Sequence, residues 1–246
     1  MNETLRIQQS HRSIRSYRPD PVSDEMLNEI VAAAHRAPTS MNAQEISLVV
    51  VRDAEKRARI AELAGGQPWI AQAPVFIVIA IDFHKTDLGT RKAGQAQIIH
   101  ESMEGFGVAA TDAGIVLGTL ITAAESLGLG IVPIGGIRRN PHGIIDLLGL
   151  PPLTFPLVGL CIGHIRDDVL PKPRMDIKTF RHDEHYDASG YPAAIDAYDT
   201  ALMDYWKQIG RSDGMPWSSN LGNFYKQVYF PQVKPVAAMQ GLLNDK

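Results

Sequence analysis

The chain of 246 residues is poor in cysteine, and its single thiol, Cys161, excludes an intrachain disulfide and any metal site built from several cysteines. Cys161 stands in the apolar run from 155 to 162, which is typical of a central strand. A buried structural thiol is therefore expected there rather than a nucleophile. The scarcity of cysteine also fits a reducing compartment, and we expect a cytoplasmic protein.

No excess of one charge is present, since 24 Lys and Arg residues face 27 Asp and Glu residues. The basic residues are spread along the chain instead of forming the stripe of a nucleic-acid binder, so no nucleic-acid partner is expected. The first ten residues lack the basic and apolar regions of a secretory signal. The most apolar long stretch, 105–127, contains Asp112, Glu125 and several hydroxyl residues, which favours a helix buried in protein over a membrane span.

Apolar spacing and capping residues predict alternating helices and strands. Ser23 can cap a helix whose first turn carries Asp24 and Glu25, and this helix should end near Pro38. Because the strands lack polar alternation, helices should cover the sheet on both faces, in an α/β or α+β fold. The expected helices are 23–38, 54–63, 105–127, 144–148 and 191–209, and the expected strands are 46–51, 75–81, 131–134 and 155–162.

The tail from 217 to 246 differs from the rest of the chain. Aromatic and β-branched residues crowd between 224 and 233, after a polar gap that contains glycine and proline. Side chains of this kind must be buried against something. Composition alone leaves two alternatives, in which the tail folds back on its own domain or wraps a second subunit.

The strongest local pattern is a cationic turn near the start of the chain. His11, Arg12, Ser13 and Arg15 lie within five residues, and Arg18 follows. The guanidinium groups repel one another unless an anion or solvent separates them, and a phosphate accepts the forked hydrogen bonds that arginine donates. Such bonds contribute about 1.5 to 3 kcal/mol each, so a few of them suffice to hold a phosphorylated cofactor. A solvated basic turn explains the pattern equally well from the residues alone.

Two later segments leave a similar choice open. Lys172 and Arg174 flank Pro173, which prevents a helical pairing of the two side chains. In isolation an exposed linker is the favoured interpretation. Gly135 and Gly136 follow the third expected strand, where their backbone N–H groups could approach a flat ligand closely. A tight turn accounts for these glycines as well.

Other motifs lack the context that their chemistry needs. A G-x-G-x-x-A pattern from 105 to 110 is not preceded by a strand, so it does not indicate a dinucleotide site. The H-E-x-x-E pattern from 100 to 104 lacks the second histidine of a zinc site. Histidines and an aspartate between 182 and 187 stand in a polar loop of a kind that is usually surface. We therefore expect neither a Rossmann site nor a metal.

Taken in order along the chain, these segments resemble the nitroreductase superfamily, and in particular its branch of major oxygen-insensitive nitroreductases and NADPH-flavin reductases. The resemblance spans most of the chain. Its anchors agree in order and spacing, and they are residues 11–15, 38–44, 65–67 with 71–73, 123–130, 134–136 and 172–174.

The resemblance implies an α+β fold in which helices flank a central, mainly antiparallel sheet. It implies one domain over residues 1–246, with an excursion from about 191 to 246. It also implies FMN as the cofactor and a homodimer with two FMN sites at the subunit interface. The tail would then embrace the partner subunit.

The family's cofactor-binding residues carry over by position. His11, Arg12, Ser13 and Arg174 resemble the residues that hold the FMN phosphate and ribityl end. Arg15 and Lys172 resemble those on the N1/O2 side of the ring. The remaining positions are Thr39, Ser40, Gln44 and Gln67, which would contact the pyrimidine part of the ring, and Gly135 and Gly136, whose backbone N–H groups would lie near O4 and N5.

The activity implied by the resemblance is ping-pong transfer of hydride from NAD(P)H to nitroaromatics, quinones or free flavin. The flavin carries the hydride, so no catalytic side chain is expected. A flavin-carrying redox sensor with little turnover is the alternative. Two positions depart from the family pattern. Met41 replaces a small hydroxyl residue, which predicts a more apolar acceptor pocket, and Arg211 beside Asp213 is the only arginine where NADPH-selecting relatives carry several, so NADPH is favoured only weakly.

Overall fold

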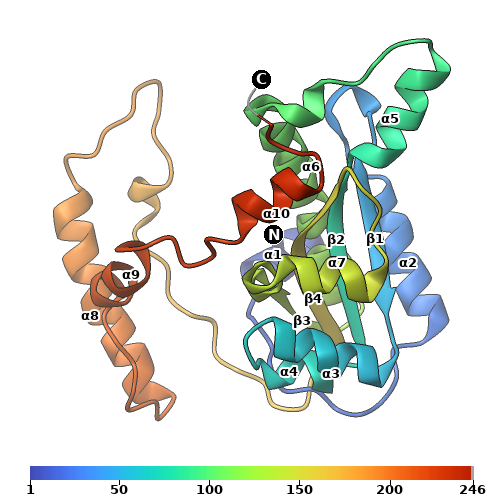
Figure 1. Cartoon of the computed structure of the whole chain (residues 1–246). Coiled ribbons are helices and arrows are strands. Elements are labelled where there is room, and N and C mark those ends of the chain that lie inside the picture. Colours follow the sequence, from blue (N-terminus) through green and yellow to red (C-terminus); the bar gives the residue numbers. More distant parts are fainter. Residues whose placement is uncertain (245–246) are drawn as a thin grey trace. The chain divides into compact units, whose positions relative to one another are not determined.

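The computed structural model of the chain describes residues 1–244. Contacts between residues divide it into two compact units, which Figure 1 draws in one picture. The first unit contains residues 1–168 together with the chain from Phe230 onward, and the second contains Val169–Tyr229. The segment outside the first unit thus begins directly after Asp168, and the chain returns at Phe230.

The first unit contains four strands and most of the helices. Its strands are β1 (Ile46–Val51), β2 (Val75–Asp82), β3 (Leu129–Ile134) and β4 (Thr154–His164). Its helices are α1 (Glu3–Gln9), α2 (Asp24–His35), η1 (Ser40–Asn42), α3 (Ala54–Leu63), α4 (Pro68–Gln72), α5 (Phe83–Lys92), η2 (Ile99–Glu101), α6 (Met103–Ser126), η3 (Gly135–Arg139), α7 (Pro141–Leu148) and α10 (Val233–Met239).

The four strands form one antiparallel sheet in the order β1-β2-β4-β3. The central strand β2 is buried along nearly its whole length, as its unbroken apolar sequence predicts. Helix α2 begins where expected, because the Ser23 side chain accepts a hydrogen bond from the backbone N–H of Met26. An α+β fold with a mainly antiparallel sheet is thereby confirmed.

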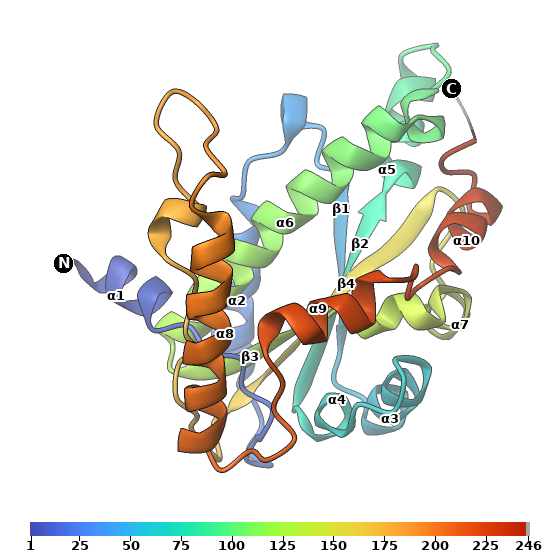
Figure 2. The same ribbon diagram turned by 90° about the vertical axis from the view of Figure 1, so that its left-hand side faces the viewer.

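Helices cover both faces of this sheet, with α2 and α6 on one side and α3, α4 and α7 on the other (Figures 1 and 2). Side chains of β2 alternate between the two layers. Ile77 and Ile79 pack in the cluster that contains residues of α2 and α6, whereas Phe76 and Val78 pack in the cluster that contains residues of α3 and α4. The sheet is therefore buried on both sides by different helices.

Helix α6 crosses the sheet but leaves one face uncovered in the described chain. By length and composition alone α6 could span a membrane, but one such helix is weak evidence for a membrane protein. Here α6 packs against α2 and β2. The sequence predicts burial on nearly every side, and in this respect the structure differs. The exposed residues of this face are Met103, Glu104, Gly107, Thr111, Gly114, Ile115 and Gly118.

The second unit contains η4 (Ile177–Thr179), α8 (Tyr191–Gln208) and α9 (Trp217–Tyr225). Tyr198, Leu202 and Trp206 are the buried residues of α8. The Tyr198 hydroxyl donates a hydrogen bond to the Pro173 carbonyl at 3.0 Å. These contacts fix the stretch that carries the Lys-Pro-Arg motif to α8 within the second unit.

The end of the tail packs on the first unit. Val236, Ala237 and Leu242 are buried in a cluster with Ile81 and Phe155 of the sheet. Of the two alternatives for the tail, the described segment from 230 to 244 therefore follows the first, in which it folds back on its own chain. The aromatic residues Phe224, Tyr225 and Tyr229 of the tail remain exposed. The contact of the tail with a partner subunit stays a prediction.

Candidate functional site

The cationic turn follows the outer edge of strand β3. Ser13 forms a parallel bridge with Ile131, and the backbone N–H of Ile14 donates to the Ile131 carbonyl at 2.9 Å. The Ile14 side chain is 1% exposed and packs in the core. Burial of this one side chain holds the turn in place, so the polar residues on either side of it, including Ser13 and Arg15, remain accessible.

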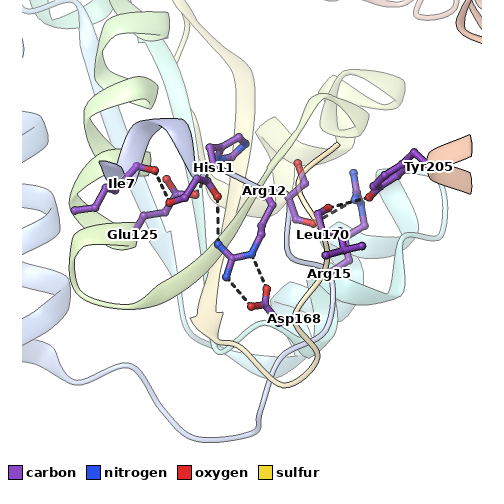
Figure 3. A network of polar contacts seen from close by, with 10 residues as sticks. Ile7, His11, Arg12, Arg15, Glu125, Asp168, Leu170 and Tyr205 are labelled. Carbon is purple, nitrogen blue, oxygen red and sulfur yellow. Dashed lines mark hydrogen bonds and ion pairs between the residues drawn. The ribbon is translucent and has the colours of Figure 1, made fainter. Parts of the chain in front are cut away.

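Two carboxylates already engage the first cations of this turn (Figure 3). The His11 Nδ1 atom lies 2.7 Å from Oε1 of Glu125, near the end of α6. Arg12 donates from Nε and Nη2 to the two carboxylate oxygens of Asp168, at 2.5 and 2.8 Å. A phosphate would receive the same forked pair of donors. The Arg12 side chain is thus held in a geometry that suits a tetrahedral oxyanion.

Arg15, Gln67 and Gly136 are each linked to the layer of α3 and α4, Arg15 through Trp69 and Gly136 through Gln67. The Arg15 guanidinium lies 5.6 Å from the centre of the Trp69 ring in α4. Gln67 caps the start of α4, and its Nε2 donates to the Ala64 carbonyl at 3.0 Å. A Cβ on Gly136 would lie 2.2 Å from that Nε2 atom, so only glycine fits there. Arg15 and Gln67 are therefore both near residues of α4, and Gly136 lies beside Gln67. That they contact one flavin ring stays a prediction.

The loop with Thr39, Ser40 and Gln44 is held by helix α6 instead. The Ser40 backbone N–H donates to Oδ2 of Asp112 at 2.8 Å, and the Gln44 N–H donates to the Thr39 hydroxyl at 3.1 Å. The loop is strained, because Met41, Asn42 and Gln44 have φ values of 52°, 55° and 56°. One hydrogen bond to α6 and one within the loop maintain this conformation.

A buried carboxyl pair lies under this loop. Glu45 is 2% exposed and Asp112 is 4% exposed, and Oε2 of Glu45 has no hydrogen-bond partner in the described chain. Burial raises the pKa of Glu45, and the hydrogen bond and charge of Asp112 raise it further. A proton shared between the two carboxyl groups would satisfy the buried oxygen.

Within one chain, the loop and the Gln67 surface lie apart. Ile46 pairs with Ile81 and Val51 pairs with Phe76, so the loop before β1 adjoins the Ile81 end of the ladder. Trp69 belongs to the other end, because its carbonyl lies 3.9 Å from the thiol of Cys161, which itself pairs with Phe76. Five residue steps correspond to roughly 16 Å along a strand. The two groups also lie on opposite faces of the sheet.

The remaining predicted contacts belong to the second unit. The Lys172 Nζ atom lies 4.7 Å from the centre of the Trp206 ring, and Arg174 donates to the Lys172 carbonyl at 3.2 Å. Arg211 donates to both carboxylate oxygens of Asp213, at 2.9 and 3.2 Å. That these residues meet the same ligand as the cationic turn stays a prediction.

Two cavities of about 600 Å³ in the first unit lie elsewhere, and neither is lined by a residue predicted to bind FMN. One is lined by Arg59, Glu62, Leu63, Arg139, Asn140, Pro141, His142, Gln232 and Val236, and the other by Pro19, Pro21, Val22, Ser23, Asp24, Arg52, Arg57, Gln72 and Pro74.

The G-x-G-x-x-A pattern from 105 to 110, which was not expected to bind a dinucleotide, has a packing role at its first glycine. A Cβ on Gly105 would lie 2.1 Å from the Ile99 carbonyl oxygen.

Sequence reasoning missed the carboxylates of Asp168 and Glu125 and the ring of Trp69. Each contacts the cationic turn across at least 50 residues of chain, so spacing along the sequence carries no sign of the contact. The charged stretch after β4, which contains Asp168, was the one feature of the sequence that could have indicated a partner for Arg12.

Comparison with known proteins assigns both the N-terminal and the C-terminal part of the chain to one family. The Nitroreductase family model matches residues 9–164, and the model of the Nitroreductase family, C-terminal domain, matches residues 172–245. A relative from Bacillus subtilis (strain 168), named FMN reductase [NAD(P)H], is 41% identical over 249 residues, with all of both chains covered.

Two solved structures agree with this result. The structure of B. megaterium NfrA2 is 40% identical, with a TM-score of 0.97 over all of both chains. The NADPH:FMN oxidoreductase from Vibrio harveyi complexed with NAD⁺ is 30% identical, with a TM-score of 0.89 over 98% of this chain and 99% of the other.

Fold, site and comparisons define an NAD(P)H-dependent oxidoreductase that uses FMN. The chain belongs to the Nitroreductase family, including its C-terminal domain. The chemistry of the cationic turn fits this cofactor, because Arg12 already forks a carboxylate in the way it would fork a phosphate. The backbone at Gly136 is free of a Cβ where a flat ring would approach Gln67.

Proposed function

We propose that the protein transfers hydride from NADPH, in preference to NADH, to nitroaromatics, quinones or free flavin in a ping-pong cycle. The observation that supports this most directly is the fork of Arg12 on a carboxylate, close in sequence to Arg15, whose guanidinium lies over Trp69 of α4. Gln67 stands at the start of the same helix and lies beside Gly136. FMN, when bound, supplies the hydride-transfer chemistry. Two relatives support NAD(P)H as the donor, namely the FMN reductase [NAD(P)H] of Bacillus subtilis and the Vibrio harveyi oxidoreductase in complex with NAD⁺.

The residues of the chain would bind and orient the cofactor. His11, Arg12, Ser13 and Arg174 would hold its phosphate and ribityl end. Arg15 and Lys172 would place positive charge at the N1/O2 side of the ring, which stabilises a reduced, anionic flavin. Thr39, Ser40, Gln44 and Gln67 would contact the pyrimidine part of the ring, and Gly135 and Gly136 would offer backbone N–H groups near O4 and N5.

The acceptor side would be apolar and accessible. Met41 is 97% exposed at the tip of the strained loop, where it can contact a flat, electron-poor molecule. No side-chain acid or base is needed in this scheme, because hydride moves between cofactor and substrates.

We further propose a homodimer in the cytoplasm, in which the site is completed by the partner. One chain keeps the Thr39–Gln44 loop and the Gln67 surface on opposite faces of its sheet. A second copy on the exposed face of α6 could supply its own loop to the ring. Gly107, Gly114 and Gly118 leave open space along that face, which permits close approach of another helix.

Sustained turnover tests this function against the redox-sensor alternative. The purified protein should carry one FMN per chain and oxidise many equivalents of NADPH when a quinone or nitroaromatic is supplied. A sensor would consume about one equivalent of NADPH per FMN and then stop. Stopped-flow absorbance with limiting enzyme separates the two results. A preparation that stays apo when FMN is added contradicts both.

A further inference from the structure

The loop that follows α8 is built around one tryptophan, Trp206, which is 8% exposed. The Arg211 backbone N–H donates to the Trp206 carbonyl at 2.8 Å, and the indole Nε1 donates to the Met215 carbonyl at 3.0 Å. Gly214 lies so close that a Cβ there would be 2.2 Å from Cγ of Trp206. Both ends of the stretch from 211 to 215 are therefore fastened to this side chain or its backbone.

Two cations approach the same indole ring. The Arg211 guanidinium carbon lies 4.8 Å from the ring centre, and the Lys172 Nζ lies 4.7 Å from it. The negative face of an indole attracts cations at these distances. The ring thus orients the guanidinium of Arg211 in addition to fixing its backbone.

Asp213 occupies the donors of Arg211. Both carboxylate oxygens accept from the guanidinium, and these hydrogen bonds lower the pKa of Asp213, so the carboxylate is charged at neutral pH. The fork of an arginine binds phosphate in the same way that it binds carboxylate. A phosphate monoester that approaches Arg211 must therefore displace Asp213 and meet its negative charge.

We propose that Trp206 and Asp213 set the choice between NADPH and NADH, with Trp206 as the positioning residue of Arg211 and Asp213 as a built-in competitor of the 2′-phosphate. This inference rests on the proposed function and on the expectation, drawn from the family resemblance, that Arg211 meets the phosphate of NADPH. Asp213 would weaken the binding of NADPH alone, because only NADPH carries the 2′-phosphate. It would therefore lower the preference for NADPH over NADH without contacting the part that the two nucleotides share. With Asp213 on its fork, the single arginine should give only a weak NADPH preference.

Asp213→Asn tests the competitor directly, and Asp204→Asn is its matched control. Both carboxylates are exposed in the second unit and paired with a cation, but Asp204 pairs with Lys207. Asp213→Asn should lower the KM for NADPH about threefold to tenfold and leave the KM for NADH within about twofold. Binding of adenosine 2′,5′-bisphosphate, measured by calorimetry, should tighten in parallel, whereas AMP binding should not change. An unchanged NADPH to NADH ratio in Asp213→Asn overturns the proposal.

Trp206→Phe and Trp206→Leu test the positioning role. Phenylalanine keeps an aromatic face under Arg211 and should keep the donor ratio within about twofold, whereas leucine should raise the KM for NADPH and spare that for NADH. Equal NADPH to NADH ratios in the two variants contradict the role of the ring, and if Trp206→Leu does not fold, Trp206→Phe and Asp213→Asn decide.

Arg211→Ala distinguishes failure of this inference from failure of the role assigned to Arg211. If it raises the KM for NADPH while Asp213→Asn changes nothing, the inference fails alone. If Arg211→Ala has no effect, the proposed role of Arg211 fails.

Discussion

Arg12 is held by a carboxylate in the structure, and this pairing bears on how the cofactor would bind. The Asp168 side chain is 63% exposed, so solvent screens its attraction for Arg12. A phosphate with close to two charges is the stronger partner for the fork. The phosphate must displace Asp168, which reduces the net gain in binding free energy, but it meets an arginine that needs little reordering.

Arg12→Ala should weaken FMN binding by about 10- to 100-fold, because one or two charge-assisted hydrogen bonds are lost. Arg211→Ala should change FMN affinity by less than about twofold, since its fork faces Asp213 in the loop after α8. Quenching of flavin fluorescence during titration of the apoprotein measures both. Equal FMN affinity in the two variants would remove Arg12 from the phosphate site.

At the scale of elements, sequence patterns predict the longer helices and all four strands. β1 and α3 lie at the predicted residues, because a β-branched apolar run and a helix capped by Asp53 are locally decisive. The α-helices α1, α4, α5, α9 and α10 were not predicted. Helix α5 has few apolar residues, and α10 has seven residues whose burial depends on contacts with distant strands. Such elements are stabilised by tertiary packing, which local patterns do not reveal.

The loop between α2 and β1 shows how one element holds another. Its anchor on α6 includes the buried pair of Glu45 and Asp112, whose like charges cannot both be ionised without cost. A carboxyl whose pKa is raised on folding stabilises the fold below its unfolded pKa. That contribution is lost as the pH rises through the folded pKa.

Glu45→Gln should therefore stabilise the protein at alkaline pH, since glutamine stays neutral and can donate to Asp112. At pH 8 we expect a rise in Tm of about 2 to 4 °C, which corresponds to about 1 kcal/mol for a chain of this size. The gain should shrink as the pH falls toward the unfolded pKa of about 4.3. Calorimetry at several pH values measures it, with exposed Glu55→Gln as the control. A Tm difference that is the same at every pH would show that Glu45 does not titrate with the fold.

At the scale of the whole molecule, the family pattern predicts which residues should bind the cofactor, but it does not show where these residues lie. Thr39 and Gln67 carry over from the same family pattern, yet the chain places them on opposite faces of its sheet. Spacing along a chain cannot show whether two contacts come from one subunit or from two. The exposed, glycine-rich face of α6 is the corresponding feature in the structure, because Met103 and Ile115 are exposed on it and Gly107, Gly114 and Gly118 leave open space.

Gly114→Arg tests the proposed dimer on that face. In the single chain a Cβ on Gly114 meets nothing within 4 Å, so the fold should tolerate the substitution, whereas a partner helix packed there would clash with the side chain and its charge. Gly89→Arg on α5 is the matched control, since a Cβ on Gly89 also meets open space. Light scattering should give a dimer for the wild type and Gly89→Arg and a monomer for Gly114→Arg. Because each half of the proposed site needs the other chain, FMN affinity should fall at least about tenfold in the monomer. A monomer that still binds FMN with wild-type affinity would place both halves of the site in one chain.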